Sequence, residues 1–336
     1  MEPFLCAVAS QAAQEDLIGT ASPCDTFIFI ECPEPWASKA FESTGIPETL
    51  RNFVQQLASK NRRFFLITAP RSRKTVRILI YQKHVGTFAG GYDGRELQVD
   101  SLEQSEVALQ NYFQGKLSGK PIISHDIFVC VHGSRDKCCA RFGRPFFHHA
   151  LKQLDLASPS VPVRLWQVSH IGGHRFAPTA IHLPEGRFYG RLDTIAFQAL
   201  LGRIQLRSGS DGILNCDSLD ALIRTYRGWS LLPTPLQSLE RDLLAASSGQ
   251  WFFNQVAYKI LGPSQDPGTA TTLTKARLSV LSPNNLESTY EAHILKRPDQ
   301  QLRLSCEAAS PANSYQYRVT YCRPVAAVPT ALACAS

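Results

Sequence analysis

The stretch HDIFVCVHGSRDKCC, residues 125–139, decides the fold class of this chain, because it opens the clearest alternation of strand and helix patterns. The run HDIFVCV is rich in apolar and β-branched residues and predicts a buried strand. The polar segment HGSRDK predicts a loop, and a helical pattern follows from about Cys139 to Leu154. This is the first half of a strand–helix–strand unit.

The pattern continues outward from this stretch with the remaining elements of one domain. They are a strand pattern at VRLWQVSH (163–170), a loop at IGGHRFAP (171–178), a hairpin pattern (180–193) and a helical pattern (194–204). The order strand, helix, strand, hairpin, helix is that of a thioredoxin-like domain. Because parallel crossovers are right-handed, we expect the loops at 132–137 and 171–178 at one end of the sheet.

A related α/β pattern precedes this domain. Helical patterns cover 47–60 and 101–113, and they lie among three apolar strand patterns, DTFIFIECP (25–33), RRFFLITAP (62–70) and VRILIYQK (76–83). The loop QGKLSGKP (114–121) separates the two domains. We therefore predict an N-terminal α/β domain at residues 1–118 that is itself related to the thioredoxin-like fold.

The pattern changes again after Ser208. Helical segments are predicted at 217–229 and 236–261, followed by strands at 276–281, 290–297, 302–308 and 315–322. The chain is thus predicted to be an α/β protein with a thioredoxin-like domain at 119–208 and an accessory α+β region at 209–336.

Composition narrows the class of protein. With 44% hydrophobic and 19% charged residues, the chain is typical of packed globular proteins. The N-terminal segment has no secretory pattern, and no run approaches the ~18 apolar residues of a membrane helix, so we expect a soluble, cytoplasmic protein. Ten cysteines in such a chain are better explained as thiols or metal ligands than as a disulfide framework.

Two of these cysteines flank the first loop. Cys130 ends the predicted strand, and Cys139 opens the predicted helix. Helix amides and nearby cations favour the thiolate form, and the cations here are Arg135, Lys137, Arg141 and Arg144. The segment is therefore suited to binding a metal through sulfur.

Two histidines lie in the second loop. His170 and His174 are separated by Ile171, Gly172 and Gly173. The glycines leave room for a sharp backbone bend and for close approach to a bulky inorganic group. A histidine pair alone means little, but a cysteine pair and a histidine pair on two loops predicted to be adjacent indicate a metal centre. His132, in the first loop, is expected to be a solvated loop residue.

With these residues, the chain resembles the sucrase/ferredoxin-like family, whose C-terminal half is similar to thioredoxin-like 2Fe-2S ferredoxins. The resemblance rests on residues 121–205 and on FLCAVASQAAQEDLIGTA at 4–21, and it is weak after residue 210. It implies one 2Fe-2S cluster, with Cys130 and Cys139 on one iron and His170 and His174 on the other. Cys138 is the alternative to Cys139. Neutral histidine ligands raise the reduction potential, as in Rieske centres at ~ -150 to +300 mV.

Three alternatives stay open at this point. The same ligands could hold a structural zinc ion. Thiol–disulfide chemistry could use Cys138 with Cys139, or Cys6 with Cys24, although C-x-x-C is absent. A glycosidase would need two carboxylates across a sugar site, and the acidic residues near the first strand (Asp25, Glu31, Glu34 and Glu42) fit an ordinary surface better.

We therefore expect an electron carrier rather than a catalyst, with a redox or iron-linked sensor as the alternative. Its partners would be redox proteins, a reductase or an acceptor, and no nucleic-acid motif is present. The net charge of +7 favours acidic partners. A docking face could form on the basic stretch made of Lys60, Arg62, Arg63, Arg71, Arg73, Lys74 and Arg77, although a solvated surface is the simpler interpretation. Cys32, Cys216, Cys306 and Cys322 are expected to be buried small residues.

Overall fold

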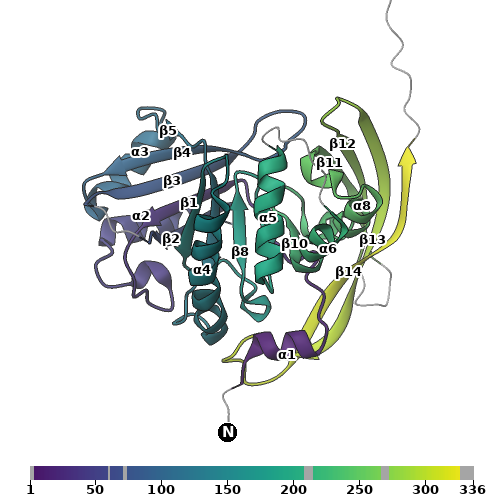
Figure 1. Cartoon of the computed structure of the whole chain (residues 1–336), viewed down its shortest axis with the longest axis horizontal. Helices are drawn as coiled ribbons and strands as arrows, with labels where there is room; N and C mark the ends of the chain where they lie inside the picture. The colour runs from purple at the N-terminus through teal and green to yellow at the C-terminus, as the bar shows by residue number, and fades with distance from the viewer. Residues whose placement is uncertain (1–3, 60, 71–73, 208–214, 266–271, 326–336) are drawn as a thin grey trace, which may run out of the picture.

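The computed structural model describes residues 4–59, 61–70, 74–207, 215–265 and 272–325. Within these ranges ten strands form one mixed sheet, in the order β10-β9-β8-β6-β7-β2-β1-β3-β4-β5 (Figure 1). The strands are β1 (Thr26–Glu31), β2 (Arg62–Thr68), β3 (Val76–Lys83), β4 (Tyr92–Val99), β5 (Lys120–Pro121), β6 (His125–Cys130), β7 (Val163–Val168), β8 (Ala180–Leu183), β9 (Arg187–Tyr189) and β10 (Tyr226–Trp229). The prediction of a mixed α/β architecture is confirmed.

The sheet consists of two halves with the same topology. In the first half the order is β2-β1-β3-β4, and in the second it is β7-β6-β8-β9. In each half the first two strands along the chain are parallel and the later neighbours are antiparallel. The halves join where β2 and β7 run antiparallel over two residue pairs, Ile67 with Val168 and Thr68 with Gln167. The predicted boundary at residue 118 stays a prediction, and the sheet continues across it.

Helices link the strands of each half. They are α2 (Glu48–Leu57) and α3 (Ser105–Phe113) in the first half, and α4 (Lys137–Ala157) and α5 (Thr194–Arg207) in the second, with the short 3₁₀ turns η1 (Ala40–Glu42), η2 (Leu102–Gln104) and η3 (His174–Phe176). Helices α4 and α5 lie side by side over the second half, where Phe146 and Phe197 make an edge-to-face contact (Figure 1).

Aromatic and aliphatic side chains from both halves share one core. All six residues of β1 are buried, as is expected for a central strand with both faces covered. The Phe29 ring of β1 stacks on the Phe128 ring of β6 with centroids 3.8 Å apart. Since β1 and β6 are not neighbours in the sheet, the two halves also pack against each other through side chains.

The C-terminal region differs from its prediction. The helix predicted at 217–229 ends early: α6 covers Cys216–Thr225, and the next residues form β10 at the sheet edge. Trp229 is buried there and donates its indole N–H to the carbonyl oxygen of Glu185 at 2.6 Å. Burial of this aromatic side chain against β9 therefore overrides the helical pattern.

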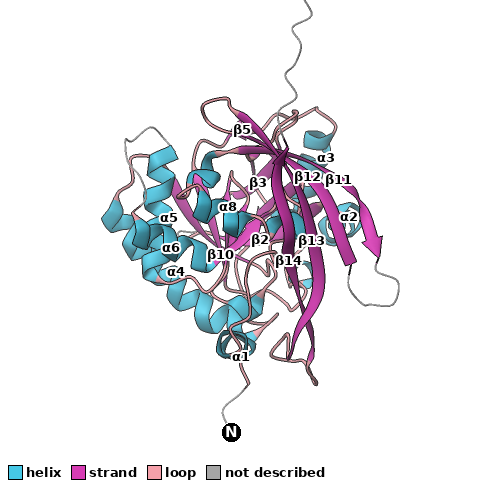
Figure 2. Ribbon diagram, turned by 90° about the vertical axis from the view of Figure 1, so that its right-hand side faces the viewer, coloured by secondary structure: helices cyan, strands magenta, loops and turns pink. Residues whose placement is uncertain are grey.

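The single helix predicted at 236–261 is wrong. The segment forms α7 (Thr234–Gln237), α8 (Glu240–Ala246), η4 (Gln250–Phe253) and then strand β11 (Gln255–Gln265). Ser248 and Gly249, with φ of +47° and +84°, adopt left-handed conformations directly after α8, and strand β11 pairs with β12. Among the described strands, β11, β12 (Thr272–Leu281), β13 (Glu287–Leu302) and β14 (Ala312–Val325) form a second, antiparallel sheet (Figure 2).

The N-terminal segment forms a short helix, α1 (Cys6–Ala12), that the sequence did not predict. It packs against η3 and lies beside the ends of β13 and β14 (Figure 1). Among the described residues, no helix combines the length and apolar character needed to span a membrane.

Candidate metal centre

The parallel strands β6 and β7 bring the two predicted loops together at the carboxyl ends of these strands. Cys130 is the last residue of β6, and Cys139 lies in the first turn of α4. Asp136 caps this helix by accepting the Cys138 N–H at 2.9 Å. His170 follows β7, and His174 opens η3. The predicted placement of both loops agrees with the structure.

Three of the four predicted ligands form one compact group. The Sγ atoms of Cys130 and Cys139 and a ring nitrogen of His170 all lie within 4.8 Å of one another. His170 Nδ1 is 3.7 Å from Cys139 Sγ. Both cysteines are only 1% exposed, whereas His170 is half-buried. The group therefore has a buried sulfur side and a histidine side closer to solvent.

The fourth predicted ligand, His174, lies beside this group and makes other contacts. Its ring centroid is 5.2 Å from that of His170, and its side chain is 19% exposed. His174 Nδ1 is 3.1 Å from Asp136 Oδ2 and 3.4 Å from Cys6 Sγ. The ring nitrogen that His174 could offer to a metal next to His170 is therefore Nε2.

The adjacent thiols of Cys138 and Cys139 point to different neighbours. Cys139 joins the group with Cys130, whereas Cys138 Sγ lies 3.6 Å from Cys6 Sγ and 3.3 Å from Cys306 Sγ. The structure thus places Cys139, rather than Cys138, with Cys130.

Hydrogen bonding shifts the pKa values of Cys130 and Cys139 in opposite directions. Cys130 accepts from the Cys139 thiol and from His170, and these bonds lower its pKa despite its burial. The pKa of Cys139 is raised, because it donates to Cys130 and is itself buried. Of the two thiols, Cys130 is therefore the more acidic.

Comparison with known proteins places the chain in a family. A family model described as sucrase/ferredoxin-like matches residues 17–213, more than half of the chain. The chain belongs to the sucrase/ferredoxin-like family. It is also similar to altered inheritance of mitochondria protein 32 from Meyerozyma guilliermondii, with 34% identity over 70 residues. That alignment covers 20% of this chain and 24% of the length of that relative. No solved structure matches the chain.

A buried arginine supports the histidine loop of this sucrase/ferredoxin-like chain. Arg227 donates to the carbonyl oxygen of Gly172 at 3.1 Å and to that of Thr20 at 2.6 Å. Gly173, with φ +77°, lies against the guanidinium group, and a Cβ there would overlap it. Burial, with Arg175 nearby, lowers the pKa of Arg227 to about 9. Arg227 belongs to β10 and carries no motif, so its role could not be predicted from the sequence.

His132 is not the solvated loop residue that the sequence predicted. It is 2% exposed, and its Nε2 lies 2.7 Å from the Ala37 carbonyl oxygen. Its Nδ1 accepts the backbone N–H of His170 at 3.1 Å. Nε2 must then carry the proton, so a neutral His132 fixes the backbone of one predicted ligand. Burial lowers its pKa, which is consistent with this neutral form.

The histidine loop borders an open hollow of about 350 Å³. Its lining includes Gly172, Gly173 and the cationic side chains of Arg175, Arg227 and Lys296. The hollow beside the histidine loop therefore has basic side chains in its lining.

The basic stretch at 60–77 does not form a single exposed face. Arg77 is buried and pairs with Glu31 at 2.7 Å, and burial lowers the pKa of Arg63. Lys60, Arg71 and Arg73 lie outside the described residues. The prediction of a surface role is thus wrong for Arg77.

Three of the four carboxylates considered for a glycosidase form ion pairs with cations. Glu31 pairs with Arg77, Glu34 with Arg144 at 2.7 Å, and Glu42 with Lys39 at 3.1 Å. Each of these glutamates therefore takes part in an ion pair of its own, which fits a structural role.

The structure corrects several predictions for the other cysteines. Cys6 lies with Cys138 and Cys306, whereas Cys24 donates to the Thr26 carbonyl oxygen at 3.1 Å, so Cys6 and Cys24 do not form a pair. Cys32 is buried as predicted, but Cys216 and Cys322 are exposed, and Cys306 is intermediate. No disulfide joins any of the described cysteines.

His125, His182 and Glu185 form another group of potential metal ligands. Glu185 Oε2 accepts from Arg203 at 2.7 Å and from Arg187 at 3.1 Å. Two buried guanidinium groups beside one carboxylate disfavour a cation at this position. We therefore interpret this group as a structural ion network.

Proposed function

We propose that this chain is an electron-transfer protein with one 2Fe-2S cluster on Cys130, Cys139, His170 and His174. The observation that carries the proposal is the shared group of two buried thiols and a half-buried imidazole, with His174 beside it. Two thiolates and two imidazoles are the ligand set of Rieske-type clusters, so the residues fit such a group chemically. When bound, the cluster would supply reversible one-electron transfer.

The topology supports the ferredoxin part of the proposal. The strand order β7-β6-β8-β9, with β8 antiparallel to β6, agrees with the thioredoxin-like order inferred from the sequence. Since the first half has the same order, both halves would be thioredoxin-like. The cluster ligands belong to the second half alone.

Neighbouring residues would position the cluster ligands. Asp136 holds Nδ1 of His174, as carboxylates commonly do for metal-binding histidines. His132 holds the backbone of His170. Arg227 places a buried guanidinium group against the glycines of the loop, and its positive charge would favour an added electron.

The exposure of the histidines favours coupling between electron and proton transfer. His170 and His174 are partly exposed, so their rings can exchange protons with water. An added electron increases the basicity of a ligand imidazole, and the reduced form would then hold more protons. The reduction potential should therefore fall as the pH rises, which protein-film voltammetry across pH 6–10 would measure. A potential independent of pH would remove the histidines from the proposal.

The basic hollow beside the histidine loop is where we place the redox partner. Arg175, Arg227 and Lys296 line it, so an acidic reductase or acceptor would approach the histidine side of the cluster.

A carrier should be reduced stoichiometrically by its reductase. A sensor should instead change its affinity for a partner when the cluster is lost.

The cellular location is also a proposal. The sequence favours the cytoplasm, and the name of the relative from Meyerozyma guilliermondii refers to mitochondria. Fractionation of cells that express the tagged protein would decide between the two compartments.

The decisive experiment is the analysis of anaerobically purified protein. We expect brown protein with about two iron atoms and two acid-labile sulfides per chain, and a reduced-state EPR signal with the low average g value of mixed histidine and cysteine ligation. Protein without sulfide that also fails reconstitution with iron and sulfide would overturn the proposal.

The second candidate is a structural zinc ion on the same residues. The close spacing of the ligand atoms of Cys130, Cys139 and His170, within 4.8 Å, favours a single ion. In that case Cys130→Ser would remove zinc from protein that contains no sulfide.

A further inference from the structure

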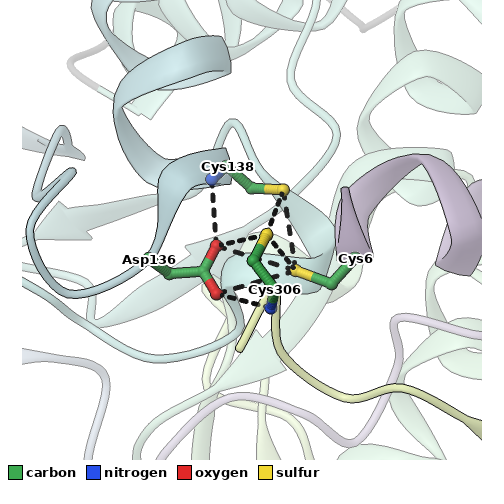
Figure 3. Close-up of side chains that lie close together, drawn as sticks. All are labelled: Cys6, Asp136, Cys138 and Cys306. Atoms are coloured by element: carbon green, nitrogen blue, oxygen red, sulfur yellow. Dashed lines mark hydrogen bonds between the residues drawn. The ribbon is translucent and has the colours of Figure 1, made fainter. Parts of the chain in front are cut away.

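A second group of potential metal ligands lies outside the proposed cluster site. Cys6 comes from α1, Asp136 and Cys138 come from the start of α4, and Cys306 comes from the turn between β13 and β14 (Figure 3). One ligand atom from each residue lies within 4.8 Å of all the others. Three chain segments that are far apart in sequence therefore converge on one point.

The spacing of the three sulfur atoms fits a single tetrahedral ion. The Sγ–Sγ distances are 3.6 Å for Cys6 and Cys138, 3.3 Å for Cys138 and Cys306, and 3.6 Å for Cys306 and Cys6. Thiolates about 2.3 Å from a tetrahedral zinc ion would be about 3.8 Å apart. The sulfur triangle is nearly equilateral and needs to widen only slightly to take the ion.

Asp136 completes the tetrahedron. Its Oδ1 is 3.2 Å from Cys306 Sγ and 3.7 Å from Cys6 Sγ. A carboxylate oxygen and a thiolate on one zinc ion would be about 3.5 Å apart. His174 Nδ1 contacts Oδ2 of Asp136 and the sulfur of Cys6, so its place is that of a hydrogen-bond partner.

The surroundings also resemble those of thiolate ligands. The backbone N–H of Ala7 points to Cys138 Sγ at 3.4 Å, and the N–H of Cys306 donates to Asp136 Oδ2 at 3.0 Å. Cys6 and Cys138 are fully buried, and Asp136 is 2% exposed. A buried carboxylate among three thiols would be stabilised by a divalent cation.

Little apolar burial holds α1 in place, and its polar anchor is Arg191, which donates to the carbonyl and hydroxyl oxygens of Ser10 at 3.0 and 2.9 Å. The apolar cluster around it contains only Cys6, Ala7, Cys138 and Ala177 as buried members, separate from the main core. So small a cluster contributes little burial, and small units of this kind are commonly stabilised by metals.

We propose that Cys6, Cys138, Cys306 and Asp136 form a second metal site, which binds one zinc ion and fastens α1 and the β13–β14 turn to the start of α4. Soft thiolate ligands in a tetrahedral arrangement select zinc over magnesium or calcium. The proposal does not rest on the 2Fe-2S cluster, because the two ligand sets share no residue.

Metal analysis of ligand variants of the full chain tests this proposal. Wild-type protein should contain about one zinc per chain, and Cys306→Ser should lose most of it while its iron and sulfide contents stay at the wild-type level. Cys322→Ser, which changes an exposed cysteine on β14, should retain the zinc. Cys130→Ser should also retain zinc, even if it loses iron. Zinc X-ray absorption should give three sulfur ligands at about 2.3 Å and one oxygen or nitrogen at about 2.0–2.2 Å.

A second measurement uses wild-type protein alone and so does not depend on the folding of a variant. Cys6, Cys138 and Cys306 should resist alkylation in zinc-loaded protein and become reactive after chelation, as peptide mapping would show. Exposed Cys216 and Cys322 should react in both states.

Three results would overturn the proposal. One is reduced, metal-free protein that takes up no zinc. Another is zinc that is lost in Cys130→Ser but kept in Cys306→Ser, which assigns the ion to the other group. The third is a disulfide among Cys6, Cys138 and Cys306 in protein as isolated, with no thiol protection by zinc after reduction.

Discussion

At the scale of single residues, the two histidines differ from the two cysteines in what their replacement should do. His170→Cys exchanges a neutral ligand for a thiolate, so the cluster should persist while its potential falls from the Rieske range towards ~ -400 mV. EPR-monitored redox titration measures this change. His148→Cys, at an exposed position on α4, is the matched control and should leave the potential unaltered. An unchanged potential in His170→Cys would mean that His170 is not a ligand.

The two glycines of the histidine loop make a matched pair for stability. Both have positive φ, +90° at Gly172 and +77° at Gly173, so alanine at either position should cost about 1–2 kcal/mol. Only at Gly173 would the new Cβ also overlap the buried guanidinium group of Arg227. Gly173→Ala should therefore lower the free energy of unfolding by clearly more than Gly172→Ala in urea denaturation. Equal losses would mean that the arginine can move aside.

Residue spacing predicted part of the site and could not predict the rest. Cys130, Cys139 and His170 could be predicted because Cys130 and Cys139 border one predicted loop and His170 lies at the start of the other. Cys6 and Cys306 contact Cys138 across 132 and 168 residues, and no local pattern reports such a contact. The role assigned to the glycines was also incomplete, since Gly173 makes room for an arginine more than fifty positions further along the chain.

At the scale of elements, the contact between α4 and β6 fixes the relative positions of Cys130 and Cys139. Gly143 of α4 lies on the Cys130 carbonyl oxygen, and a Cβ there would overlap this oxygen. Gly143→Ala should push the helix away and cost about 1–3 kcal/mol, with loss of bound metal. Gly202 of α5 has no atom within 4 Å of such a Cβ, so Gly202→Ala should stabilise the protein by up to about 1 kcal/mol. Thermal unfolding and iron content of both variants check this, and a stable, metal-loaded Gly143→Ala would contradict it.

Most strands and helices up to residue 207 follow from periodicity, because long apolar runs and amphipathic patterns are strong local signals. The exceptions are α1, β4 and the two-residue β5, which the sequence did not predict. The C-terminal region does not follow from periodicity, for two reasons. Short segments such as Tyr226–Trp229 become strands only through pairing with β9. The segment after Gly249 has apolar residues that suit either a helix or a strand, and only its pairing with β12 decides between them.

At the scale of the whole molecule, the two halves repeat one topology without a detectable sequence repeat. The sequence also does not predict the junction between the halves, since β2 and β7 pair over two positions only. The rest of the interface is side-chain packing, such as Phe29 on Phe128 and the Arg77 guanidinium 4.3 Å from the Trp166 ring centroid. Local patterns predict each half, whereas their association depends on contacts between distant residues.

This association should make the two halves unfold together. Arg164 of β7 binds Asp126 of β6 and, at 2.6 Å, Glu96 of β4, so one side chain ties strands of both halves. Asp126 is fully buried and would lose its cation in Arg164→Leu, which should cost about 3–5 kcal/mol. Lys39→Ala breaks the exposed pair with Glu42 and should cost at most about 1 kcal/mol. Urea unfolding followed by fluorescence of the tryptophans and by circular dichroism should give coincident transitions in wild-type protein and in both variants. Two separated transitions in the wild type would mean that the halves are independent folding units, and that the shared core contributes little to their stability.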